Sequence, residues 1–205
     1  MPDTYNGAYS CAEILMTTLL KIVGIAGSTR SASYSKAILD ALFGLLPDGT
    51  TTQAINIGLL PHYNEDVEHA ALPDTVSAAR AAVAASDAVI IVTPEFNHGL
   101  PGVLKNTLDW LSRPAFTSCM AGKPVFFVTF SPGALGGVRA QYQLRETLAS
   151  MLCQLVPLPE MAITHVGMKC ENGVLTDAAT LNYLTPALRK FLTHCATLSD
   201  IAVTD

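Results

Sequence analysis

The sequence predicts an α/β fold in which a five-stranded parallel sheet lies between two layers of helices, a three-layer sandwich. Short apolar runs alternate along the chain with amphipathic helical patterns, which is the order expected of a parallel sheet with crossover helices. The runs are continuously apolar, as in strands that are buried on both faces. Each run is followed by a loop rich in Gly, Ser or Pro, which marks where a strand ends.

The first strand is expected at 19–26, "LLKIVGIA", because this apolar run ends in a glycine and a Ser-rich loop. A helix follows, since apolar residues recur at helical spacing from Ile38 to Leu46 before "PDG" stops the pattern. The remaining strands are expected at 51–57, 88–92, 123–130 and around 161–164, and the remaining helices around 76–83, 103–111, 138–152 and 181–195.

A chain of 205 residues with no break in composition is long enough for one such domain. The first residues have no basic segment ahead of their apolar part, so they do not resemble an export signal. We expect residues 1–18 to be a poorly ordered extension, with Met16 as an alternative start of translation, and residues 19–205 to form the domain.

Composition excludes several classes of partner. Half of the residues are apolar, 14% are charged, and no apolar run is long enough for a membrane helix. The net charge of -5 is spread along the chain, which does not favour nucleic acid as a partner. The five cysteines form no C-x-x-C pair, which favours small buried apolar residues and a reducing cytoplasm over a metal site or a disulfide framework.

Three loops follow the strands at the edge where parallel α/β sheets bind their ligands, and they span residues 27–35, 93–102 and 131–137. The first, "GSTRSASYS", has neither Walker nor G-x-G-x-x-G spacing. Its hydroxyls, a charged fork on Arg30 and the start of the next helix suit a terminal monophosphate. The alternative is a Ser-rich helix cap beside a solvated arginine.

The second loop, "TPEFNHGLPG", places Glu95, Phe96 and Asn97 at the same edge. Asn97 and Gly99 tolerate left-handed backbone, and Pro94 and Pro101 reduce flexibility, so we expect rigid backbone amides that face a flat heterocycle. The third loop, "SPGALGG", has three glycines that allow a ligand to lie close to the backbone. Each loop alone would also suit an ordinary turn, and their common position favours a site.

Other segments have weaker functional signals. The stretch "HYNEDVEH", residues 62–69, lacks a metal-ligand spacing and is expected to be a solvated loop or a lid on the substrate side, and we expect no metal site. His98 and His165 have no catalytic motif around them. Trp110 is expected in the core or in an interface.

The chain resembles the NADPH-dependent FMN reductase family of flavodoxin-like flavoproteins, which includes bacterial quinone and chromate reductases. The resemblance covers about 21–192 and is carried by "KIVGIAGSTRSASYSKAIL", "VIIVTPEFNHGLPGVLKNTLDWLSRP" and "GKPVFFVTFSPGALGGVRAQYQLRETL". It implies a flavodoxin-like sheet, one FMN per subunit, and NADPH or NADH as donor. The cofactor-binding residues that it implies are Ser28, Arg30, Ser33, Tyr34 and Ser35 in the first loop, Pro94, Glu95, Phe96 and Asn97 at the edge of the ring, and Ser131 and Gly133 facing it.

Two positions depart from the family's pattern. Phe96 stands where tyrosine is common, so a phenolic hydroxyl is missing, and Ser35 stands where asparagine is common. The resemblance also implies a homodimer or homotetramer that packs through the helices after Gly102 and Gly137.

The function that the resemblance implies is hydride transfer from a nicotinamide to FMN and then to a quinone or a similar small acceptor. The flavin supplies this chemistry, so no catalytic acid or base is required. Two alternatives stay open. One is a reductase that supplies reduced FMN to a monooxygenase, and the other is an electron carrier or sensor without enzymatic activity.

Overall fold

The computed structural model describes residues 19–202, with side chains to residue 198. The predicted extension at 1–18 lies outside the described residues. Parallel strands alternate with helices along the chain, as predicted. The strands are β1 (Lys21–Ala26), β2 (Thr51–Ile55), β3 (Ala88–Pro94), β4 (Pro124–Phe130), β5 (Gln154–Leu155), β6 (Ala162–Ile163), β7 (Cys170–Glu171) and β8 (Val174–Leu175). The helices are α2 (Tyr34–Gly44), α3 (Glu65–Ala70), α4 (Asp74–Ala84), α5 (Gly102–Leu111), α6 (Val138–Ser150) and α7 (Ala178–Ala202), with short 3-10 turns η1 (Ile57–Leu59) and η2 (Val166–Met168).

The central sheet has the order β2-β1-β3-β4-β5, and all of its pairs are parallel. The chain moves outward from β1 to β2 and then returns to β3 on the other side of β1. The order therefore reverses between β1 and β3, which is where open parallel sheets bind their ligands. The carboxyl ends of β1, β3 and β4 lie together, because Ala26 pairs with Val92 and Pro94 pairs with Phe130.

The fifth strand is divided into two short pieces. Both β5 and β6 pair with β4, and only β6 falls within the predicted range of 161–164. Pro157 and Pro159 lie between the pieces, and proline cannot donate to a strand ladder. The strand predicted around 161–164 is confirmed as β6, whereas β5 lies outside the predicted range and is separated from β6 by these prolines.

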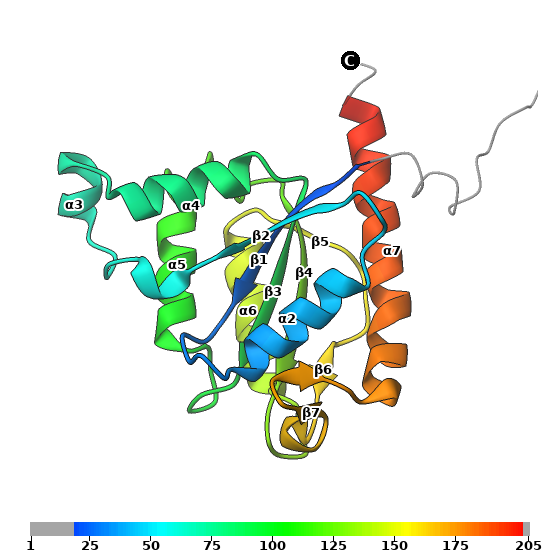
Figure 1. Ribbon diagram of the computed structural model, residues 1–205. Coiled ribbons are helices and arrows are strands. Elements are labelled where there is room, and N and C mark those ends of the chain that lie inside the picture. Colours follow the sequence, from blue (N-terminus) through cyan, green and yellow to red (C-terminus); the bar gives the residue numbers. More distant parts are fainter. Residues whose placement is uncertain (1–18, 203–205) are drawn as a thin grey trace, which may run out of the picture.

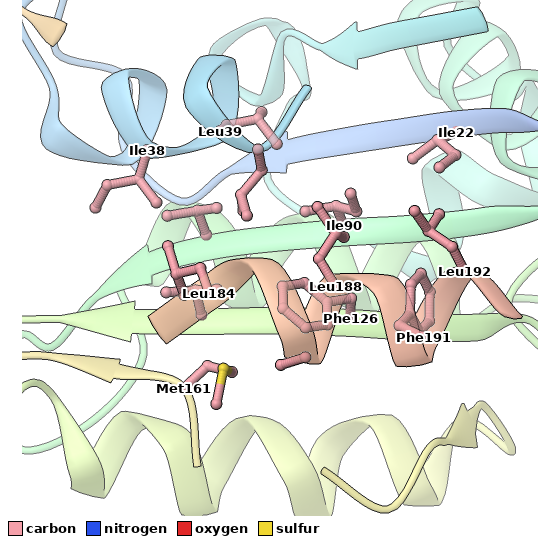
Figure 2. Packing of buried hydrophobic residues seen from close by; sticks show 14 of the residues in the cluster. Ile22, Ile38, Leu39, Ile90, Phe126, Met161, Leu184, Leu188, Phe191 and Leu192 are labelled. Carbon is pink, nitrogen blue, oxygen red and sulfur yellow. The ribbon is translucent and has the colours of Figure 1, made fainter. Parts of the chain in front are cut away.

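Two apolar clusters cover the two faces of the sheet. Successive strand residues point to opposite faces, so Ile90 contributes to one cluster and Ile91 to the other. The first cluster lies under α2 and α7 (Figure 1), and Figure 2 shows Ile38 from α2 and Leu188 from α7 in one cluster with the strand residues Ile90 and Phe126. The second cluster packs against α4, α5 and α6 and includes the fully buried Trp110. Trp110 is thus a core residue, one of the two places expected for it.

No helix in the described part of the chain has both the length and the apolar character that a membrane crossing requires.

Candidate functional site

The first loop is anchored to β3 and then enters α2. Gly27 N–H donates to Val92 O at 2.7 Å, which fixes the start of the loop. Ser33 is the N-cap of α2, and its Oγ accepts from Ser35 N–H at 3.1 Å. The predicted loop of 27–35 is therefore two residues shorter, because Tyr34 and Ser35 already belong to the helix.

Two groups in this loop suit a negatively charged ligand. Ser35 is fully buried, and its hydroxyl oxygen has no hydrogen-bond partner among the described residues. A buried hydroxyl without a partner costs stability. Arg30 is exposed and forms no ion pair within residues 19–202. The first turn of α2 contains no acidic residue that would repel an anion.

Tyr34 has a packing role in this structure. Its ring lies edge-on to Phe130 at the end of β4, with ring centroids 6.2 Å apart. A Cβ built on Gly167 would lie 3.4 Å from the Tyr34 hydroxyl. Tyr34 therefore connects the start of α2 with the carboxyl end of β4 and with η2.

The second loop makes a two-residue hairpin. Phe96 and Gly99 exchange both backbone hydrogen bonds at 2.9 Å, and Asn97 and His98 between them have φ of 48° and 65°. Two left-handed residues in this position define a type I′ turn. Asn97, which tolerates this backbone, takes the first left-handed position, and His98 rather than Gly99 takes the second. A Cβ at Gly99 would lie 2.6 Å from Gln143 Oε1, so a side chain there would displace the end of Gln143, which accepts from Leu100 N–H.

Glu95 ties the second loop to α6. Its carboxylate accepts from Arg139 N–H at 2.9 Å and from Ala140 N–H at 3.3 Å, so it caps the N-terminus of α6 from another loop. Its side chain is only 12% exposed and lies 3.6 Å from the Arg139 guanidinium. Leu100 N–H donates to Gln143 Oε1 at 2.7 Å and adds a second tie. These bonds hold the second loop against α6, and Phe96 projects from it with 56% of its surface exposed.

The third loop rests on a segment that sequence reasoning did not include in the site. Ser131 Oγ donates to Gly133 O at 3.2 Å, and His165 N–H donates to the same carbonyl at 3.0 Å. Val166 N–H donates to Ser131 O at 3.1 Å. These bonds bring 165–168 to the edge of the sheet, where Met168 is 87% exposed. The sequence feature that could have predicted this is that residues 165–168 directly follow β6, a strand parallel to β4.

The segment at 62–69 is more ordered than predicted. Residues 65–70 form α3, and Glu68 pairs with Arg80 of α4 at 2.6 Å with side chains only 13% and 16% exposed. Burial alone would raise the pKa of Glu68, but hydrogen bonds from Arg80 and Tyr63 outweigh it and lower the pKa below the ordinary value of 4.5. The prediction of a solvated loop is therefore wrong for Glu68, although His62, Glu65 and Asp66 are exposed.

The three predicted loops thus follow adjacent strands and lie at one edge, at the lower end of the sheet in Figure 1. A parallel α/β sheet with a hydroxyl-rich helix start at its reversal point is the arrangement in which nucleotide- and flavin-binding proteins hold their ligands.

Sequence and structure comparisons identify the family. Residues 20–167 match the family described as NADPH-dependent FMN reductase, and the chain belongs to it. The chain is 40% identical to an NAD(P)H-dependent FMN reductase of Pseudomonas aeruginosa over 166 residues, covering 80% of this chain and 89% of the relative. It is 36% identical to a quinone reductase of Pseudomonas putida over 176 residues, covering 86% and 95%.

A solved structure of the flavoenzyme FerB, an NAD(P)H:(acceptor) oxidoreductase from Paracoccus denitrificans, has a TM-score of 0.78 and 30% identity. The match covers 87% of this chain and 98% of that one. The chain is accordingly a flavodoxin-like, NAD(P)H-dependent flavin oxidoreductase.

Proposed function

We propose that the protein is an FMN-containing NAD(P)H:quinone oxidoreductase, with the flavin held at the edge formed by the three loops. Relatives of 35 to 38% identity are named quinone reductases or a 2-hydroxy-1,4-benzoquinone reductase, which supports a quinone as acceptor. Bound FMN would supply the chemistry of hydride acceptance from NAD(P)H and of two-electron reduction of a quinone to a hydroquinone, with uptake of two protons.

The phosphate of FMN is assigned to the first loop. The buried, unpartnered hydroxyl of Ser35 is the observation that carries this assignment, since a phosphate oxygen would supply its missing partner. Ser33 caps the same helix, Ser28 and Arg30 precede it in the first loop, and the dipole of α2 favours a negative charge at its start. The residues present therefore fit a monophosphate.

The ring of FMN is assigned to the second and third loops. Pro94, Glu95, Phe96 and Asn97 would lie along its edge, with backbone amides as hydrogen-bond donors, and Ser131 and Gly133 would face it. The Glu95 carboxylate already accepts two amides of α6, so it acts on the ring by fixing the loop. The rigid hairpin keeps the amides aimed before any ligand arrives, which lowers the entropic cost of binding.

Two variants test the phosphate assignment. Arg30→Ala should raise the Kd for FMN by roughly 10- to 150-fold, because a charge-assisted bond is lost, and should leave riboflavin binding unchanged. Ser35→Ala should also weaken FMN binding, yet the flavin-free variant should be as stable as the parent or more stable, because an unsatisfied buried hydroxyl is removed. If both variants bind FMN as the parent does, the phosphate assignment is wrong.

The proposed assembly is a homodimer or homotetramer in the cytoplasm. Exposed apolar side chains lie beside and on α6, namely Leu135 and Tyr142, which are 55% and 56% exposed, and a second copy would cover them. Cys119, Cys153 and Cys170 are free thiols, which suits a reducing compartment. Light scattering of the purified protein tests the assembly, and a monomeric mass would refute it.

A further inference from the structure

The chain between β2 and α3 is fastened to α5 by two side chains of the "LKNTLDW" stretch. Asn106 accepts from Tyr63 N–H at 2.7 Å and donates to Pro61 O at 2.9 Å. Trp110 Nε1 donates to the same Pro61 carbonyl at 2.8 Å. Both lone pairs of this carbonyl are therefore used, and Trp110 is fully buried. The two partners of each contact are more than 40 residues apart in the sequence, so tertiary contacts with α5 hold the chain between β2 and α3 in place.

A second set of contacts holds the Tyr63 side chain. Its ring lies edge-on to Trp110, with centroids 4.9 Å apart. Its hydroxyl donates to Glu68 at 3.1 Å and accepts from Arg113 Nε at 3.1 Å. Arg80 completes the set, since it pairs with Glu68 and donates from Nε to Trp110 O at 3.0 Å. Charged and aromatic groups thus fix the segment from both sides.

The same segment touches the first loop at its other end. Gly58 lies in η1, and a Cβ built on it would be 3.1 Å from Thr29 Cγ2. The hydrogen bond from Gly58 N–H to Asn56 Oδ1 at 3.2 Å and the burial of Ile57 hold η1 in place. Because η1 has one side against α5 and the other against Thr29, a shift of the segment changes the support of the first loop.

We propose that Asn106 and Trp110 are positioning residues for the phosphate loop. Their hydrogen bonds hold Pro61 and Tyr63 in place, and these residues in turn hold η1. Because η1 packs against Thr29, it restricts the conformations that Thr29 and the first loop can adopt. The loop is then preorganised, and less entropy is lost when a phosphate binds. Neither side chain touches the ligand in this account. The inference rests on the proposed assignment of the first loop to the FMN phosphate.

Titration of the full-length, flavin-free protein with FMN and with riboflavin tests the proposal. Asn106→Ala and Trp110→Phe should each weaken FMN binding by about fivefold and riboflavin binding by less than about twofold. Ser112→Ala is the matched control, because it removes one side-chain hydrogen bond at the end of α5 at 2.8 Å without touching the segment. Parent-like FMN binding, or an equal loss for FMN and riboflavin, would overturn the proposal.

If substitutions in α5 prevent folding, two variants at the contact between η1 and the first loop, Gly58→Ala and Thr29→Ser, still test the proposal. Gly58→Ala places a methyl group against Thr29 and should weaken FMN binding selectively. Thr29→Ser removes the methyl that is contacted and keeps the hydroxyl, so the double variant should recover the parent's affinity. Failure of Gly58→Ala to weaken FMN binding, or failure of Thr29→Ser to restore it, would refute the contact as a support.

Arg30→Ala separates this inference from the proposed function. If Arg30→Ala leaves the ratio of FMN to riboflavin affinity unchanged, the phosphate assignment fails and the inference fails with it. If Arg30→Ala changes that ratio while Asn106→Ala, Trp110→Phe and Gly58→Ala do not, the inference alone is wrong.

Discussion

Glu95 offers a test of how the site is built, because its carboxylate caps a helix that starts 43 residues later in the chain. Glu95→Ala removes two charge-assisted bonds from backbone amides and a favourable charge at the N-terminus of α6. From the usual cost of losing a cap and a charged acceptor, we expect about 2 to 3 kcal/mol less stability. The Arg139 pair adds little, since its guanidinium is half-exposed.

For a chain of this length, that loss corresponds to a decrease in Tm of about 5 to 10 °C. Glu95→Gln keeps an acceptor and loses the charge, so it should cost about 1 kcal/mol. Thermal unfolding is measured on flavin-free protein, because a bound ligand would shift Tm by itself. Glu146→Gln and Glu146→Ala are the controls, since Glu146 is an exposed carboxylate on α6. If the Glu95 variants have the same Tm as the corresponding Glu146 variants, the Glu95 cap does not contribute to stability.

Three further predictions follow from other parts of the chain. Gly133→Val should change the free energy of unfolding by less than about 1 kcal/mol, since a Cβ there meets no atom within 4 Å. It should reduce kcat/KM on the order of tenfold, because the side chain enters the space assigned to the rings. Parent-like kinetics would show that the third loop is not part of the site. The Glu68 pKa is lowered by folding, so its stabilisation is present above about pH 4.5 and is lost as the pH falls through the lower folded-state pKa. Glu68→Gln should therefore lose less stability than the parent on acidification, and parallel stability curves against pH would contradict this. A chain starting at Met16 should keep its flavin and activity if residues 1–18 are a dispensable extension, and colourless or insoluble protein would refute that expectation.

Local sequence signals predicted the parts of the fold that depend on short-range pattern. The continuous apolar runs located β1, β3 and β4, because buried strands have recognisable residue types. The Ser-rich stretch indicated that a helix follows it, although α2 already begins at Tyr34, inside the predicted loop. Asn97 likewise has the propensity for left-handed backbone that its turn requires.

Contacts between distant segments were not predictable in this way. Glu95 could be assigned to the site by its loop, but its partners at Arg139 and Ala140 follow from how β3 and β4 pair. The same holds for Asn106, whose partners lie more than 40 residues earlier. The split of the fifth strand was signalled by its prolines, whereas the approach of 165–168 to the third loop depends on tertiary packing.

The central claim is that this protein passes electrons from NAD(P)H through bound FMN to a quinone, and one anaerobic spectrum tests it most directly. The purified protein should be yellow, lose its visible flavin absorbance within seconds of adding NADPH or NADH, and regain it when a benzoquinone is added, with one hydroquinone formed for each nicotinamide oxidised. An electron carrier or sensor would stay yellow with both nicotinamides. Protein that stays yellow, or whose reduced flavin the quinone does not reoxidise, would contradict the account.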